Sequence, residues 1–221
     1  MKIGKILVLI PFFWIIISCG LSPLEEKANQ FADEIVNVNE ESTLFIEDSS
    51  NANLYLFETN DTRYLNNAGY TLFTTNKTNE SDGFETINVD MMKLAGNAEA
   101  GYGIIFCEQT IDSKPFMLSI LINTNGLYTI GKITNGEFYH LDNNWRYSSH
   151  INKGYGIKNK VSVSYDENLS SFNLQINDSD ITSFTIPERI TFKNSKSGFV
   201  VVISNRENFP EKSVKVEFEI Q

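Results

Sequence analysis

The sequence predicts an all-β domain built from two antiparallel sheets, preceded by a signal peptide and a short amphipathic helix. From about Thr43, short apolar runs with a period of two alternate with clusters of Asn, Gly, Asp and Ser, as in half-buried strands joined by turns. Turn residues recur roughly every 8 to 12 residues, which is typical of sandwiches and barrels. No helical pattern separates the runs, so a parallel α/β fold is disfavoured. With 221 residues, 41% apolar and 12% aromatic, the chain can form one such core and additional segments.

Residues 1–18 are predicted to be a signal peptide. Lys2 and Lys5 precede an apolar run over residues 6–17. A membrane span needs about 20 residues, so a run of about 12 fits the hydrophobic region of a signal rather than an anchor.

The end of this segment carries a lipidation motif. Residues 16–19 read Ile-Ile-Ser-Cys, which resembles the lipobox of bacterial lipoproteins. The resemblance implies cleavage after Ser18 and lipid attachment at Cys19, and several acyl chains would anchor the protein stably. Gly20 favours the outer membrane or cell surface over retention in the inner membrane. The alternative is an ordinary secretory signal with an incidental cysteine.

Residues 19–42 form the predicted lipidated N-terminus and tether, with a helix over residues 23–36. Ser22, Pro23 and Glu25 have the order of a helix cap with a capping box. The polar face is acidic, which favours packing on the domain over lying on a membrane. A flexible stalk is the alternative. The apolar residues that recur at helical spacing are Leu24, Ala28, Phe31, Ala32 and Ile35.

Residues 43–221 form the predicted β domain. Asn125-Gly126 and Asn135-Gly136 separate alternating runs, and both pairs suit the positive φ angles of tight primed turns. They predict a three-stranded meander over residues 116–141. The predicted strands cover residues 53–58, 70–74, 84–94, 103–109, 116–123, 127–134, 137–141, 160–165, 171–176, 181–186, 198–205 and 213–220.

The order of several short motifs resembles the concanavalin A-like lectin and glucanase jelly rolls, in the branch with laminin-G-like and 3-keto-disaccharide-hydrolase-like modules. These motifs are residues 84–90 (FETINVD), 100–106 (AGYGIIF), 126–132 (GLYTIGK), 145–151 (WRYSSHI) and 198–203 (GFVVVI). The resemblance covers residues 45–221 and implies a two-sheet jelly roll. It also implies a concave sheet whose groove can hold an extended glycan or peptide.

One hairpin departs from this family pattern. Asn177-Asp178 stands where relatives often carry Asn-Gly. We therefore expect a longer turn there and a less certain register between the two flanking strands.

The sequence contains no recognisable catalytic set. A family 16 glucanase resemblance would require Glu-x-Asp-x-x-Glu on one strand, but residues 85–90 place Ile87 at the middle position. There is also no Gly-x-Ser-x-Gly elbow, and His140 and His150 lie in polar stretches. We therefore expect a protein that is not an enzyme. The alternative is a carbohydrate-active enzyme of the 3-keto-disaccharide-hydrolase-like branch.

Cys107 and three aspartates are considered as a nucleophile and as metal ligands, respectively. Cys107 lies in an apolar run and is expected to be a small buried hydrophobe rather than a nucleophile. Calcium is the one cofactor for which suitable oxygen ligands are present, at Asp178, Asp180 and Asp142. Solvated turn residues are the alternative interpretation of these three carboxylates.

The candidate ligand-binding residues are aromatic and cationic. Trp145, Arg146 and Tyr128 lie in the stretch where aromatic residues are densest, and Trp and Tyr stack on sugar rings and anchor interfaces. The alternative is that these rings fill the core or seal its edge.

The charge of the chain restricts its partners. The formal net charge is −10, and a nucleic-acid binder needs a basic patch, so DNA and RNA are disfavoured. The expected partners are a membrane, through lipidated Cys19, and a glycan or an envelope or host protein. The sequence thus predicts a lipid-anchored envelope protein with a binding or adhesion module, or an envelope scaffold for a protein partner.

Overall fold

The computed structural model describes residues 40–41, 45–48, 50–141 and 144–221. The predicted signal peptide, Ser18, Cys19, the helix over residues 23–36 and Asp142 lie outside these residues. Within the described ranges, no helix is both long enough and apolar enough to cross a membrane.

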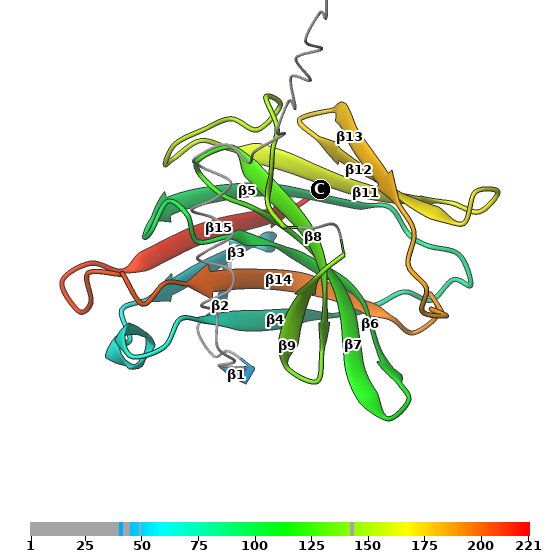
Figure 1. The fold of residues 1–221 in the computed structure, drawn as a ribbon, viewed down its shortest axis with the longest axis horizontal. Coiled ribbons are helices and arrows are strands. Elements are labelled where there is room, and N and C mark those ends of the chain that lie inside the picture. Colours follow the sequence, from blue (N-terminus) through cyan, green and yellow to red (C-terminus); the bar gives the residue numbers. More distant parts are fainter. Residues whose placement is uncertain (1–39, 42–44, 49, 142–143) are drawn as a thin grey trace, which may run out of the picture.

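The described chain folds into two sheets, which confirms the all-β sandwich with jelly-roll architecture (Figure 1). All pairings are antiparallel except that of β1 with β4. Sheet A has the order β1 (Glu40–Glu41), β4 (Gly69–Thr78), β14 (Lys196–Ile203), β6 (Tyr102–Ile111), β7 (Lys114–Ile122), β8 (Leu127–Thr134) and β10 (Arg146–Tyr147), with β9 (Glu137–His140) also paired to β8. Sheet B has the order β13 (Ser179–Phe184), β12 (Ser171–Ile176), β11 (Asn159–Asp166), β5 (Ile87–Ala95), β15 (Val214–Ile220), β3 (Asn51–Thr59) and β2 (Phe45–Asp48). A short 3-10 helix, η1 (Thr62–Leu65), precedes β4.

The main core lies between the two sheets. Alternate residues of each strand enter it, as the period of two predicts. Phe199 of β14 stacks on Phe218 of β15 with ring centroids 4.5 Å apart. Phe172 of β12 contacts Phe106 of β6, also across the two sheets. Burial of apolar side chains, among them these large rings, is the dominant favourable contribution to folding.

The outward face of sheet B is polar. Lys158 forms ion pairs with Asp90 at 3.2 Å and with Glu219 at 3.0 Å. On the same side, Lys215 pairs with Glu58 at 2.9 Å. These groups lie at or near the surface, so this face is stable in contact with water.

The outward face of sheet A is apolar and buried. Its side chains form a second cluster, here called the outer cluster, which is distinct from the core between the sheets. Its members are Ala68, Tyr70, Leu72, Ala100, Ile105, Met117, Leu121, Leu127, Ile133, Trp145, Val200 and Val202.

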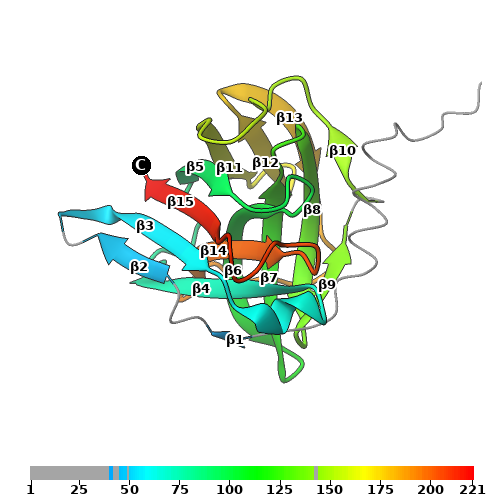
Figure 2. The same cartoon turned by 90° about the vertical axis from the view of Figure 1, so that its left-hand side faces the viewer.

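Part of the cover over the outer cluster comes from the β8–β9 hairpin. Figure 2 shows β9 and β10 on the side of sheet A that faces away from sheet B. The hydroxyl of Tyr70 on β4 donates a hydrogen bond to the carbonyl oxygen of Gly136 at 2.6 Å. Because β4 and β8 are four strand positions apart in the sheet, this bond requires that sheet A is strongly curled around its outer face.

The two predicted tight turns have different outcomes. Asn135-Gly136 has φ angles of 53° and 79°, which confirms the primed turn, whereas the prediction for Asn125-Gly126 was wrong. There only Gly126 has a positive φ, and the loop covers residues 123–126. The Asn123 side chain accepts bonds from the backbone of Asn125 and Leu127, which stabilises this longer loop.

The hairpin at Asn177-Asp178 is tighter than predicted. Both residues have positive φ angles, 51° and 61°, and only these two residues separate β12 from β13. Asn and Asp tolerate this left-handed conformation. The Asn177 side chain also accepts a bond from the backbone nitrogen of Lys160 at 2.9 Å. The irregular register instead arises at a bulge between Leu174 and Gln175.

Lys93 on β5 is fully buried near the 96–101 loop. Its Nζ donates hydrogen bonds to the carbonyl oxygens of Asn97 at 2.7 Å and Ala100 at 2.8 Å. Burial lowers the pKa of Lys93 from 10.5 to about 8, although the charge of Glu207 opposes this shift. The Lys93 ammonium therefore holds the 96–101 loop through two hydrogen bonds, although burial disfavours the charged form of this side chain.

This pKa predicts a pH-dependent stability. Above pH 8 the unfolded chain binds more protons at Lys93 than the folded chain, so the free energy of unfolding rises with pH. Between pH 8 and 9 the unsubstituted chain should gain about 1 kcal/mol relative to a Lys93→Met variant. Urea titrations of both proteins at the two pH values measure this difference.

The pH window matters for this comparison. Burial raises the pKa of Cys107 from 9 to about 12, so its titration lowers stability above pH 9. Because Cys107 is present in both proteins, its effect cancels. Parallel pH profiles for the two proteins would contradict the prediction.

Candidate functional site

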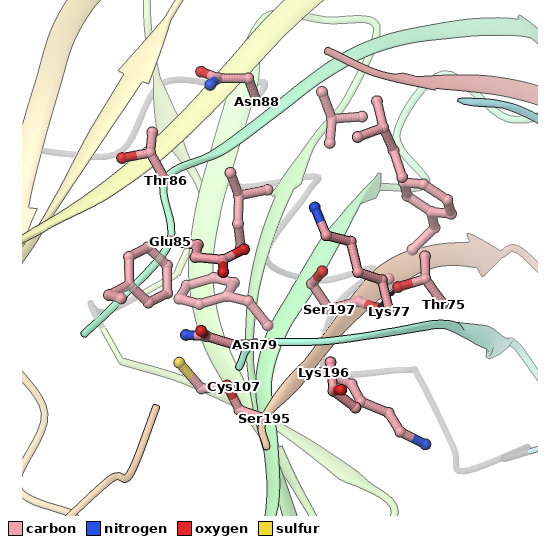
Figure 3. A pocket seen from close by; sticks show the side chains of 18 of the residues that line it. Thr75, Lys77, Asn79, Glu85, Thr86, Asn88, Cys107, Ser195, Lys196 and Ser197 are labelled. Atoms are coloured by element: carbon pink, nitrogen blue, oxygen red, sulfur yellow. Dashed lines mark hydrogen bonds between the residues drawn. The ribbon is translucent and has the colours of Figure 1, made fainter. Parts of the chain in front are cut away.

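A pocket opens at one end of the sandwich, between the two sheets (Figure 3). The empty space within it and at its mouth, including open solvent, is about 790 Å³. The end of β4 and the start of β14 form one side, and the start of β5 forms the other. It is here called the end pocket.

The floor of the end pocket is apolar and its rim is polar. Phe84, Phe106, Phe199, Ile87 and Val89 supply the apolar surface. Phe84 is half-buried and touches Phe106 edge to face, with ring centroids 6.0 Å apart. This arrangement of an apolar surface beneath a few polar groups is typical of small-ligand sites.

Two charged side chains point into the opening. Figure 3 shows Glu85 and Lys77 reaching toward its centre from opposite sides, whereas Lys196 is directed away. Within the described part of the chain, neither Lys77 nor Glu85 has a hydrogen-bond or ion-pair partner. An uncommitted ammonium and an uncommitted carboxylate are therefore available to a ligand.

Other polar groups of the rim stabilise the protein itself. Thr75 donates a hydrogen bond to the carbonyl oxygen of Ser197 at 3.0 Å. Asn79 donates to the carbonyl oxygen of Gly83 at 2.8 Å, and Ser195 donates to that of Phe192 at 2.6 Å. These bonds hold the two walls of the end pocket in place.

A β-bulge shapes the end pocket. The pairing of β14 shifts between Lys196 and Gly198 against both of its neighbours, and β6 shifts between Phe106 and Gln109. Cys107, inside this bulge, has a φ of 55°. Bulges re-aim side chains and end regular pairing, and here the sheet opens at this point.

Cys107 lines the end pocket but is a poor nucleophile. It is buried, as predicted, and burial raises the pKa of its thiol to about 12. The thiol is therefore protonated at neutral pH, and the thiolate is the nucleophilic form.

Among the described lining residues, Glu85 is the one carboxylate side chain. Glycoside hydrolysis usually uses a pair of carboxylates flanking the bond. The pocket lacks such a pair among these residues.

The structure separates the three predicted ligand-binding residues. Trp145 is 2% exposed and belongs to the outer cluster. Tyr128 is 6% exposed and belongs to the core between the sheets, on the opposite face of sheet A. Arg146 is exposed and pairs in register with Tyr128. The two rings thus fill cores, in line with the alternative interpretation, and the three residues form no common surface.

The predicted calcium ligands are also separated. Asp178 forms an ion pair with Lys160 at 2.7 Å, which raises the pKa of Lys160. Asp180 accepts a hydrogen bond from Gln175 at 2.8 Å. No group of three or more His, Cys, Asp or Glu side chains suited to a metal occurs within the described ranges, which omit Asp142.

Sequence reasoning did not single out Lys77, and it considered Glu85 only as part of an incomplete catalytic motif. The lining comes from segments around residues 75–89, 106–107 and 195–199. The pairing of β14 with both β4 and β6, together with the packing of β5 from sheet B across from them, brings these segments together. The available signal was Glu85 at the start of the strand predicted over residues 84–94, which the structure begins at Ile87.

Comparison with known proteins supports the fold. No family model matches the chain, and no curated protein matches it. A carbohydrate-binding module, CBM66 from Bacillus subtilis, is similar in structure at 8% identity and a TM-score of 0.50, over 76% of this chain and 97% of that chain. A β-glucanase from Bacillus licheniformis is similar at 9% identity and a TM-score of 0.52, over 81% of each chain. A prokaryotic β-1,3-1,4-glucanase (lichenase) derived from a mouse hindgut metagenome is similar at 7% identity and a TM-score of 0.53, over 80% of this chain and 81% of that chain. These similarities show the fold alone: the chain is a two-sheet jelly roll like these three structures.

Proposed function

We propose that this protein is a glycan-binding module of the cell envelope, that its binding site is the end pocket, and that lipidated Cys19 anchors it to a membrane. The observation that carries the binding proposal is the pair of uncommitted charges, Lys77 and Glu85, above an aromatic floor. A sugar ring presents an apolar face of C–H groups and a rim of hydroxyls. The first suits Phe84 and the floor, and the second suits an ammonium donor and a carboxylate acceptor.

The end pocket is favoured over the curved face of sheet A. That face would be the natural groove for an extended chain, but Trp145, Tyr70 and the rest of the outer cluster fill it with buried apolar groups. A polar glycan would lose its bonds to water there without replacing them. We therefore infer that the module binds a short segment or an end of a glycan.

We propose that the protein binds the glycan without cleaving it. A single carboxylate side chain in the described lining supports it, because glycosidases usually need two. Both a carbohydrate-binding module and glucanases are among the structurally similar proteins, so the distinction needs an experiment. Turnover of a polysaccharide that is abolished by Glu85→Gln would replace the binding proposal with an enzyme.

Substitutions in the end pocket should weaken glycan binding. Glu85→Gln and Lys77→Met each remove one charge-assisted hydrogen bond, so we expect each to lower affinity for the best glycan about tenfold or more. A glycan array followed by calorimetry on residues 19–221 with Cys19→Ser, with and without calcium, measures this. Both side chains lie at the surface, so the melting temperature should change little.

Matched controls locate the effect. Glu80→Gln and Lys114→Met make the same changes at exposed positions outside the pocket and should leave affinity unchanged. Equal losses in pocket and control variants would contradict the proposed site. If the array shows no glycan binding in either calcium condition, a protein partner becomes the better hypothesis.

Cys19 should be the site of lipid attachment. In a bacterial host, the chain should incorporate labelled palmitate and fractionate with membranes. Cys19→Ala should abolish both, whereas Cys107→Ala should change neither, because Cys107 is buried in the domain. Labelling that persists in Cys19→Ala would overturn the anchor.

A further inference from the structure

The end pocket presents one uncommitted charge of each sign. Lys77 lies on β4 of sheet A, and Glu85 lies two residues before β5 of sheet B. Their side chains reach the opening from opposite walls (Figure 3). In the described part of the chain they form an ion pair neither with each other nor with another residue. Exposed lysines elsewhere in this protein do pair, as Lys158 does with Glu219 at 3.0 Å.

The rest of the lining leaves these two charges to determine what the pocket binds. Lys196 is the one other charged side chain of the described lining, and Figure 3 shows it directed away from the centre. The floor is apolar, with Phe84 touching Phe106 edge to face. A molecule in the pocket therefore meets an ammonium on one wall, a carboxylate on the other and aromatic surface between them.

A ligand on this floor displaces water from both charged groups. A charged group that loses water without gaining a partner is destabilised. A sugar hydroxyl replaces part of the lost hydration. An opposite charge replaces more, because charge-assisted hydrogen bonds are roughly twice as strong as neutral ones. A ligand with a single charge compensates only one wall, so the best complement of the pocket carries both charges.

The charge of the whole chain favours the same class of ligand. The formal net charge is −10, which repels a purely acidic glycan at long range. A purely basic glycan would be attracted, but its ammonium groups would repel Lys77 and leave it without a partner. A ligand with one charge of each sign avoids both penalties.

We propose that the preferred ligand of the end pocket is a zwitterionic sugar unit. Its carboxylate pairs with Lys77, its ammonium pairs with Glu85, and the apolar face of its ring lies on Phe84. This inference rests on the proposed function, because it names the class of glycan for the same site.

The opposite placement of the two charges restricts the sugar further. In a 2-amino-2-deoxyhexuronic acid, the amino group on C2 and the carboxylate attached to C5 lie diagonally across the pyranose ring, so each can face its own wall. In muramic acid, the amino group on C2 and the carboxylate arm on O3 are neighbours. The pocket should therefore prefer the first arrangement, and equal or tighter binding of muramic acid would contradict pairing with opposite walls.

Four methyl glycosides isolate the contribution of each charge. Glucose carries neither group, glucosamine the ammonium, glucuronic acid the carboxylate, and 2-amino-2-deoxyglucuronic acid both. Calorimetric titration of residues 19–221 with Cys19→Ser, at about pH 6 where sugar amines and carboxylates are both charged, measures the four affinities. We expect each matching charge to raise affinity about threefold to fivefold, and the two together about tenfold or more.

Single variants assign each charge to its partner. In Lys77→Met, the zwitterionic sugar should bind no better than glucosamine, which should keep its advantage over glucose. In Glu85→Gln, it should bind no better than glucuronic acid, which should keep its own advantage. Lys77→Arg retains the positive charge and should retain the preference for the carboxylate. The control variants Glu80→Gln and Lys114→Met should leave all four affinities unchanged.

Either of two results would overturn the proposal. One is a zwitterionic sugar that binds no more tightly than the singly charged sugars, and the other is a pair of pocket variants that weaken all four sugars by one common factor. Glucose binding that is lost in both pocket variants would then leave the proposed function intact. The glycan array tests that function without reference to charge, so the failure of both proposals is distinguishable from the failure of this one.

Discussion

Trp145→Ala should lower the free energy of unfolding by about 3–5 kcal/mol, the usual range when a buried tryptophan is removed from a core. Trp145 is 2% exposed and is one of the largest fully buried side chains. It lies so close to β6 that a Cβ at Gly101 would approach its ring to 2.7 Å. The surrounding strands are tied into sheet A and would collapse only partly into the space left behind. Urea titration, monitored by far-ultraviolet circular dichroism, measures the loss.

The neighbouring Tyr147 provides a matched control. It lies two residues further along the chain, on β10, and is 47% exposed, so Tyr147→Ala should change stability by about 0.5 kcal/mol or less. Under conditions where Trp145→Ala remains folded, its glycan affinity should equal that of the unsubstituted chain, because Trp145 does not line the end pocket. Lost binding with unchanged stability would instead restore Trp145 as a ligand-stacking residue.

Gly198→Ala should be similarly damaging, with a loss of about 3 kcal/mol or more, at the upper end of what overpacking costs. A Cβ at Gly198 would lie 1.8 Å from the carbonyl oxygen of Phe73 on β4. Backbone cannot rotate away as a side chain can, so β14 and β4 would have to separate at the bulge. Because the bulge forms one wall of the end pocket, we expect glycan affinity to fall together with the melting temperature.

Gly83→Ala is the control for this substitution. A Cβ there would meet only the Glu167 side chain, at 3.5 Å, an ordinary contact distance. Its stability should therefore remain within about 0.5 kcal/mol of the unsubstituted chain. Thermal unfolding of both variants measures the contrast. A Gly198→Ala protein as stable as Gly83→Ala would show that the two strands are not packed as described.

Local features of the sequence were sufficient to predict most of the strands and one of the tight turns. Alternation of apolar and polar residues depends only on the two-residue period of a strand, so it located most strands of both sheets to within a few residues. It did not predict the short strands β1, β2 and β10. The Asn135-Gly136 turn followed from the backbone freedom of its two residues. Turn predictions failed at Asn125-Gly126 and Asn177-Asp178, where neighbouring side chains take part in the turns. The Asn123 side chain accepts hydrogen bonds from the backbone nitrogens of Asn125 and Leu127, and the Asn177 side chain accepts one from that of Lys160.

The functional surfaces depended on the tertiary structure. The alternation shows which residues of a strand share one face of the sheet. It does not show whether other parts of the chain pack over that face. Trp145 was therefore predicted to bind ligand, whereas in the structure it is buried in the outer cluster. The end pocket joins residues more than 100 positions apart, such as Lys77 and Ser195, through the pairing of β14 between β4 and β6. The sequence by itself thus determined which segments become strands and predicted the lipid-anchor motif. Only the packing of distant strands decided which side chains are buried and which remain available to a ligand.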